Sequence, residues 1–123
     1  MCRKCNTKND KVVMLPCSGA SNLGQLANQA AVQLAREGVG NMSCLAGIGA
    51  HIENFVRAAK QAGRLVAIDG CALGCTKKVL EHADIPADTY VMVSELGFEK
   101  NMNTVLDEAD VERVKSAVKS LVQ

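Results

Sequence analysis

Short apolar runs and amphipathic stretches alternate along this chain. The apolar runs predict buried strands, because four to eight such residues between turn residues suit a strand covered on both faces. Lys11 to Pro16 and Arg64 to Asp69 are the clearest runs. The segment Gly40 to Cys44 is shorter and more polar, but it lies where a strand is due, and Thr89 to Val93 supplies a fourth strand.

The stretches between and after these runs place apolar residues at helical spacing. This spacing predicts helices that turn one apolar face toward a sheet. Ser21 or Asn22 can cap the first helix, and Gly38 can end it. The predicted helices cover about residues 22–37, 50–62, 75–83 and 110–122.

Regular alternation of strands and helices predicts an α/β fold. Consecutive parallel strands need a crossover, and a helix usually provides it. We therefore expect a three-layer αβα sandwich with a roughly four-stranded, mainly parallel sheet. A chain of 123 residues, 48% of them hydrophobic, fits one core. Residues 11–123 are expected to form a single α/β metal-binding domain, and residues 1–10 a flexible or metal-ordered N-terminal arm.

Four of the six cysteines follow predicted strands. In open parallel sheets, ligands bind at the carboxyl ends of the strands. A tetrahedral set of four thiolates is the usual form of a structural zinc site. The sequence therefore predicts a zinc site at this edge of the sheet, with four candidate ligands: Cys17, Cys44, Cys71 and Cys75.

Three segments around these cysteines resemble a known family. They are Cys17-Ser-Gly-Ala-Ser, Gly38-Val-Gly-Asn-Met-Ser-Cys44-Leu-Ala-Gly-Ile-Gly and Asp69-Gly-Cys71-Ala-Leu-Gly-Cys75. With them the chain closely resembles the DGC domain family, named for its Asp-Gly-Cys motif, over nearly everything after the arm. The resemblance implies a zinc-binding domain whose four chelating cysteines correspond to the same four positions, and it implies no established biochemical role.

The expected partner is a metal ion, and the sequence identifies no protein partner. The chain has 14 Lys and Arg against 13 Asp and Glu and few aromatic residues, so nucleic acid is not an expected partner. No secretory signal or membrane-length apolar run is evident, so we expect a cytoplasmic protein without a membrane partner. A cytoplasmic location also favours metal or thiol chemistry over structural disulfides.

Several alternatives stay open at this point. The zinc could be structural, or the protein could handle or sense it. Cys71 with Cys75, or Cys17 with Cys71, could instead serve a thiol-redox or sulfur-transfer enzyme. Four cysteinates also suit an iron–sulfur cluster. Cys2 and Cys5 could join the same site, bind a second metal ion, or belong to a frayed terminus.

Three other residues invite a simpler interpretation. Asp69 is expected to orient a cysteine loop by accepting backbone N–H bonds. His51 is expected to begin a helix in a surface or capping role, and no chemistry is assigned to His82. The segment after Cys17 resembles the phosphate loop of a cysteine phosphatase, but it has no Arg before Arg36 to neutralise an oxyanion.

Overall fold

The computed structural model of the chain describes residues 11–122. The predicted arm, with Cys2 and Cys5, therefore lies outside the described residues. The strands are β1 (Val12–Pro16), β2 (Asn41–Met42), β3 (Arg64–Asp69) and β4 (Thr89–Met92). The helices are α1 (Asn22–Arg36), α2 (Leu45–Gly49), α3 (Glu53–Gln61), α4 (Cys75–His82) and α5 (Glu108–Val122), with a 3-10 turn at Val93–Leu96.

The four strands form one sheet in the order β2-β1-β3-β4, and every pairing between them is parallel. The central strands β1 and β3 pair over five positions, from Val12 opposite Arg64 to Pro16 opposite Ile68. All strands therefore end at the same edge of the sheet. The predicted α/β fold with a four-stranded parallel sheet is confirmed.

Successive side chains of the central strands enter opposite cores. In β1, Met14 lies in one core and Leu15 in the other. In β3, Val66 and Ile68 enter the first core, and Leu65 enters the second. A strand buried on both faces needs apolar residues at every position, which explains the continuous apolar runs of the sequence.

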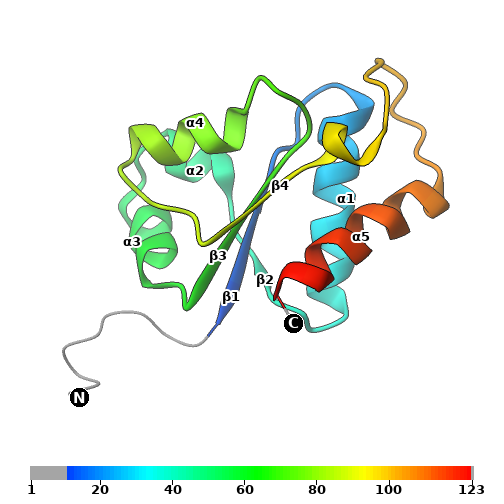
Figure 1. Cartoon of the computed structure of the whole chain (residues 1–123). Helices are drawn as coiled ribbons and strands as arrows, with labels where there is room; N and C mark the ends of the chain where they lie inside the picture. The colour runs from blue at the N-terminus through cyan, green and yellow to red at the C-terminus, as the bar shows by residue number, and fades with distance from the viewer. Residues whose placement is uncertain (1–10, 123) are drawn as a thin grey trace.

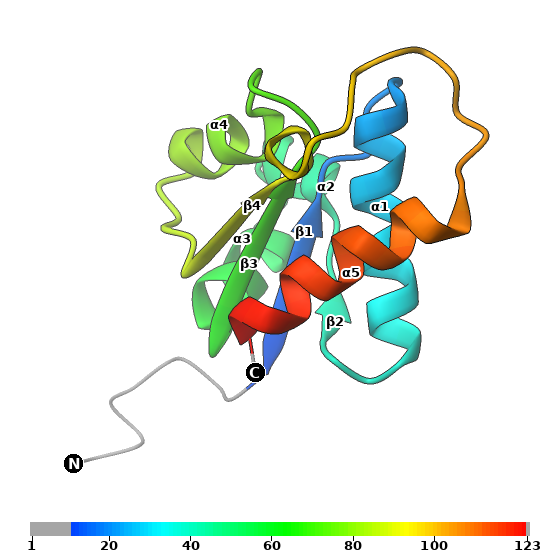
Figure 2. The ribbon, with the colours of Figure 1, turned by 45° about the vertical axis from the view of Figure 1, so that its right-hand side comes forward.

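Two layers of helices cover the sheet. Figures 1 and 2 show α1 and α5 on one face and α2, α3 and α4 on the other. The core under α1 and α5 contains Leu26 and Leu34 of α1 with Val114 of α5. The opposite core contains Ile48 of α2 and Leu80 of α4. The predicted three-layer sandwich is confirmed.

Helix α1 follows its predicted bounds closely. The side chain of Ser21 accepts a hydrogen bond from the backbone N–H of Gly24 at 3.3 Å and is the N-cap. Gly38, just past the end of the helix, has φ +83°, a conformation that glycine adopts without strain.

The helix predicted over residues 50–62 is wrong in its first part. The chain forms two helices here, α2 and α3, separated by a turn at Ala50–Ile52. His51 lies in this turn with φ +58°, so it does not begin a helix. The backbone of Ile52 is extended, and α3 starts only at Glu53. The apolar stripe of residues 50–62 belongs to a shorter helix than its periodicity suggests.

No helix within residues 11–122 combines the length and the apolar character needed to cross a bilayer.

Candidate metal centre

The four candidate cysteines all follow the carboxyl ends of strands. Cys17 comes directly after β1, and Cys44 lies two residues after β2. Cys71 lies two residues after β3, and Cys75 is the first residue of α4. Because the sheet is entirely parallel, these positions share one edge, as predicted. All four thiols are free.

Three of the four thiols line one pocket of about 210 Å³. Cys17 lines it from the loop after β1, Cys71 from the loop between β3 and α4, and Cys75 from the first residue of α4. Lys100 and Met102 line it from the segment between the 3-10 turn and α5. The fold therefore places cysteines from sequence-distant segments around one pocket.

The fourth cysteine has a different local role. The Sγ of Cys44 accepts a hydrogen bond from the backbone N–H of Gly47 at 3.3 Å and caps α2. Cys44 lines a neighbouring pocket together with Ser18. Since Ser18 lines that pocket while Cys17 and Gly19 line the first one, the loop after β1 runs between the two.

These residues match zinc in kind and number, but they are not gathered into a finished coordination sphere. Within residues 11–122, no group of three or more His, Cys, Asp or Glu side chains is arranged to hold a metal ion. Thiolates are nonetheless the softest ligands that proteins offer to zinc. All four cysteines can bind one ion only if the Cys44 side chain turns away from the N-terminal end of α2, which it caps. The four-cysteine ligand set therefore stays a prediction.

The environment of Cys17 favours the neutral thiol. Burial raises the pKa of Cys17 above its ordinary value. Backbone hydrogen bonds from Gly19 and Gly70 oppose this increase in the pKa, while the nearby charges of Cys75 and Asp69 add to it. A metal ion that binds Cys17 must therefore displace a firmly held proton.

Lys100 places a cation beside the thiols. Its Nζ lies 3.4 Å from the Sγ of Cys71. An ammonium group at this distance stabilises negative charge on sulfur. The sequence analysis did not identify Lys100, because it is 29 residues from Cys71 and no local motif marks it.

Asp69 positions the start of α4 and does not line the pocket. Its carboxylate is 1% exposed and accepts hydrogen bonds from the backbone N–H of Thr76 at 2.7 Å and of Lys77 at 3.1 Å. The Tyr90 hydroxyl donates a third, at 2.7 Å. Because α4 begins with Cys75, Asp69 orients a cysteine loop through backbone N–H groups, as predicted.

Gly70 allows the thiol loop to lie against the N-terminal end of α1. A Cβ atom at this position would be 2.7 Å from the backbone nitrogen of Gly24 and 2.8 Å from the carbonyl carbon of Leu23. No side chain fits in that space. The second residue of the Asp-Gly-Cys motif is therefore glycine for reasons of close backbone approach.

Comparisons with known proteins agree with the sequence motifs. The DGC domain family matches residues 13–118 of this chain, a range that contains all four candidate cysteines. A curated relative from Pseudomonas aeruginosa, named anaerobic and virulence modulator AnvM, is 37% identical over 98 residues. This alignment covers 80% of the present chain and 75% of the relative. No solved structure matches the chain.

Proposed function

Because this chain belongs to the DGC domain family, we propose that it binds Zn²⁺ through thiols at the carboxyl edge of its sheet and serves in metal handling or sensing. The main support is that Cys17, Cys71 and Cys75 line one pocket although they come from two separate loops. Free cysteines that only fill space have no reason to share one solvent-accessible pocket.

In the proposed order of binding, three thiolates bind the ion first and the fourth follows. Cys17, Cys71 and Cys75 provide the first three sulfur atoms. Cys44 provides the fourth after it gives up its hydrogen bond to the N–H of Gly47. Sulfur is a weak hydrogen-bond acceptor, so the loss of this bond costs less than a zinc–thiolate bond gains.

Charge at such a site needs compensation, since four thiolates and one Zn²⁺ carry a net charge of −2. Lys100, beside Cys71, contributes one positive charge. The backbone N–H of Gly19, 3.4 Å from the Sγ of Cys17, contributes a donor. The hydrogen bond from Gly19 also opposes the increase in the pKa of Cys17 that burial causes.

A regulatory role fits this arrangement. The curated relative is named a modulator, and metal binding here would couple loops that follow three different strands. Occupied and empty forms would then differ in the shape of one edge of the molecule, which a partner can read. A purely structural zinc would instead be required for the fold itself.

Metal content and spectroscopy test the proposal. Protein purified in reducing buffer without chelator or acid should contain about one zinc per chain, as a closed four-thiolate site does. Replacement by Co²⁺ should give the thiolate charge-transfer bands of tetrahedral sulfur ligation. Metal-free protein in which all six thiols titrate freely would contradict the proposal.

Single substitutions identify the ligands. Cys17→Ser, Cys71→Ser and Cys75→Ser should each lose the zinc. Cys44→Ser separates a four-thiolate site, which would lose the metal, from a three-thiolate site, which would keep it. Ser43→Ala is a matched control next to Cys44, because it removes a hydroxyl and leaves every thiol in place.

A second candidate is thiol-redox chemistry in the same pocket. Two of its free thiols, such as Cys71 and Cys75, would reduce a disulfide substrate. They would give up two electrons and two protons and form one disulfide, while the substrate becomes two thiols. The Nζ of Lys100, 3.4 Å from the Sγ of Cys71, places a positive charge beside one of these sulfur atoms.

Mass spectrometry after mild oxidation distinguishes the candidates. A reversible loss of two hydrogens at this pair supports redox chemistry, and protection by bound metal supports zinc. A brown protein with visible absorbance would indicate an iron–sulfur cluster.

A further inference from the structure

Helices α2 and α4 end with the same kind of turn. After α2, His51 has φ +58°, its N–H donates to Ile48 O at 2.9 Å, and the N–H of Ile52 donates to Gly47 O at 2.9 Å. This is the Schellman pattern, with His51 where glycine is usual. Helix α4 repeats the pattern, with Asp84 at φ +59°.

These two turns bring the only two histidines of the chain together. The Nε2 of His51 lies 3.1 Å from the Nδ1 of His82, and the ring centroids are 5.0 Å apart. The two helix ends pack closely, since a Cβ atom on Gly49 would lie 3.9 Å from both methyl groups of Val79. The packing of the two helix ends therefore places the two histidine side chains beside each other.

The spacing of the two nitrogens suits a shared metal ion. Zinc–imidazole bonds are about 2.0–2.1 Å long, so two nitrogens bound to one ion lie about 2.9 Å apart at a right angle and about 3.3 Å apart at the tetrahedral angle. The observed 3.1 Å lies between these values. We propose that His51 and His82 form a second metal site, for a divalent transition-metal ion, separate from the thiols at the sheet edge.

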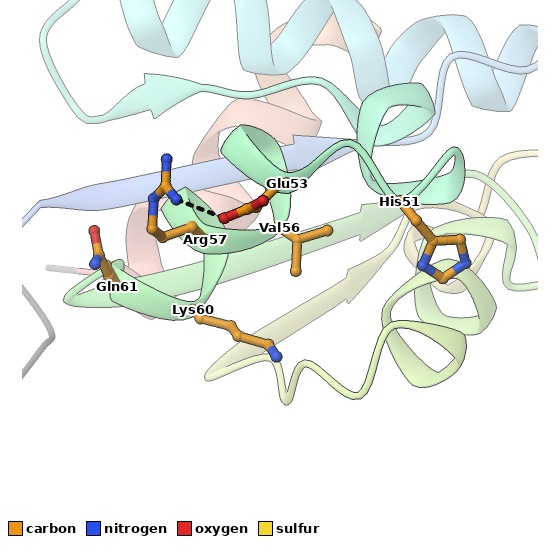
Figure 3. Close-up of a pocket in the computed structure, with 6 residues that line it drawn as sticks. All are labelled: His51, Glu53, Val56, Arg57, Lys60 and Gln61. Atoms are coloured by element: carbon orange, nitrogen blue, oxygen red, sulfur yellow. Dashed lines mark hydrogen bonds and ion pairs between the residues drawn. The ribbon is translucent and has the colours of Figure 1, made fainter.

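The local surroundings leave this site open to solvent. Both histidines are exposed, so their rings can rotate to point both lone pairs at one ion. Figure 3 shows the ring of His51 directed away from Glu53 and Arg57, which form an ion pair at 3.1 Å. Within residues 11–122, no third His, Cys, Asp or Glu completes the set. Water or a donor from another molecule fills the remaining positions, as at zinc sites that keep an open coordination position.

The chemistry of the site differs from that of the thiol pocket. Two neutral imidazoles suit Zn²⁺, Cu²⁺ and Ni²⁺ and do not require the loss of thiol protons. The pair also lies at the far end of α4 from Cys75, about 10 Å along the helix axis. Binding at the histidines is therefore expected whether or not the thiols hold zinc.

Nuclear magnetic resonance tests this site directly, because the chain has two histidines and each gives its own imidazole signals. The full chain is first saturated with the zinc that its thiols bind. More Zn²⁺ is then added near neutral pH. We expect the signals of both rings to shift together and to saturate at one additional equivalent. The same result is expected for the Cys71→Ser variant, so a failure of the thiol proposal does not affect this test.

Two variants make the result specific. His51→Gly removes one imidazole and places the usual residue in the left-handed turn, so the fold is expected to be at least as stable. His82→Gln removes the other imidazole at the end of α4. Each variant should bind the additional equivalent at least tenfold more weakly. The proposal is wrong if neither ring responds to Zn²⁺. It is also wrong if the signals of His82 shift in His51→Gly at the same Zn²⁺ concentration as in the unaltered chain. In either case the contact between His51 and His82 is a hydrogen bond only.

Discussion

The carboxylate of Asp69 accepts a 2.7 Å hydrogen bond from the hydroxyl of Tyr90, and the same carboxylate holds the first turn of α4. Asp69 ends β3, and Tyr90 lies in the neighbouring strand β4. One buried side chain thus joins two strands and the helix that begins with Cys75. The first residue of the Asp-Gly-Cys motif acts on the thiol pocket through backbone geometry.

Removal of this carboxylate should destabilise the fold. In Asp69→Ala, the N–H groups of Thr76 and Lys77 and the Tyr90 hydroxyl lose their buried acceptor. We expect the free energy of unfolding to fall by about 2–4 kcal/mol. Urea denaturation followed by circular dichroism measures the change. Asp69→Asn keeps one acceptor oxygen, so its free energy of unfolding should lie between those of Asp69→Ala and the unaltered chain. An unaltered urea midpoint in both variants would contradict this role.

Tyr90 should make folding sensitive to alkaline pH. Burial and the hydrogen bond to Asp69 raise the pKa of Tyr90 above its ordinary value. The folded state therefore retains the phenol proton more firmly than the unfolded state does. This contribution to stability is complete below about pH 10 and declines as the pH rises from there through the folded-state pKa.

The absorbance of tyrosinate measures this effect directly, since the chain has one Tyr and no Trp. Tyrosinate should form mainly as the protein unfolds. Urea unfolding between about pH 8 and pH 11 should show a smaller alkaline decline in Tyr90→Phe than in the unaltered chain. Equal declines in the two proteins would show that other groups are responsible.

The sequence predicts regular elements better than it predicts turns and side-chain directions. β3 has the predicted bounds, Arg64–Asp69, because a strand buried on both faces is a continuous apolar run. The reversal at His51 was missed, since a left-handed non-glycine residue carries no clear sequence signal. The shared edge of the four cysteines follows from parallel topology alone, whereas the direction of Cys44 depends on the cap of α2.

Alanine substitutions at two glycines test whether the close backbone approach at Gly70 fixes the thiol loop. In Gly70→Ala, the new methyl group would meet backbone atoms of Leu23 and Gly24 at 2.7–2.8 Å, and these cannot move independently of α1. We expect a loss of about 1–3 kcal/mol of stability and a weaker hold on any metal at Cys71. Thermal and urea unfolding measure the first effect, and elemental analysis measures the second.

Gly49→Ala is the matched control. Its methyl group would lie 3.9 Å from Val79, an ordinary contact, and it would be added within α2. Alanine stabilises a helix by about 0.5–1 kcal/mol relative to glycine. This variant should therefore be as stable as the unaltered chain or more so. If both substitutions have the same effect, the close approach at Gly70 is not what fixes the thiol loop.

Alkylation should distinguish the thiols of the pocket from one another. Cys17 is half-buried, and burial raises its pKa, whereas Cys75 is exposed. Only the thiolate reacts with iodoacetamide, so metal-free Cys17 should react several-fold more slowly than Cys75 near neutral pH. The rate at Cys17 should continue to increase as the pH rises past the ordinary range of a thiol. Peptide mass spectrometry of a time course measures each rate.

Unfolding in urea supplies the control for this experiment, because it removes the burial of Cys17 and should make the two rates similar. Added Zn²⁺ should slow alkylation of Cys17, Cys71 and Cys75 together if they share one ion, since a metal-bound sulfur is a weaker nucleophile than a free thiolate. Protection of Cys75 without Cys17 would place the metal on the loop after β3 alone. Equal rates at Cys17 and Cys75 in the folded, metal-free protein would mean that burial does not control the reactivity of this pocket.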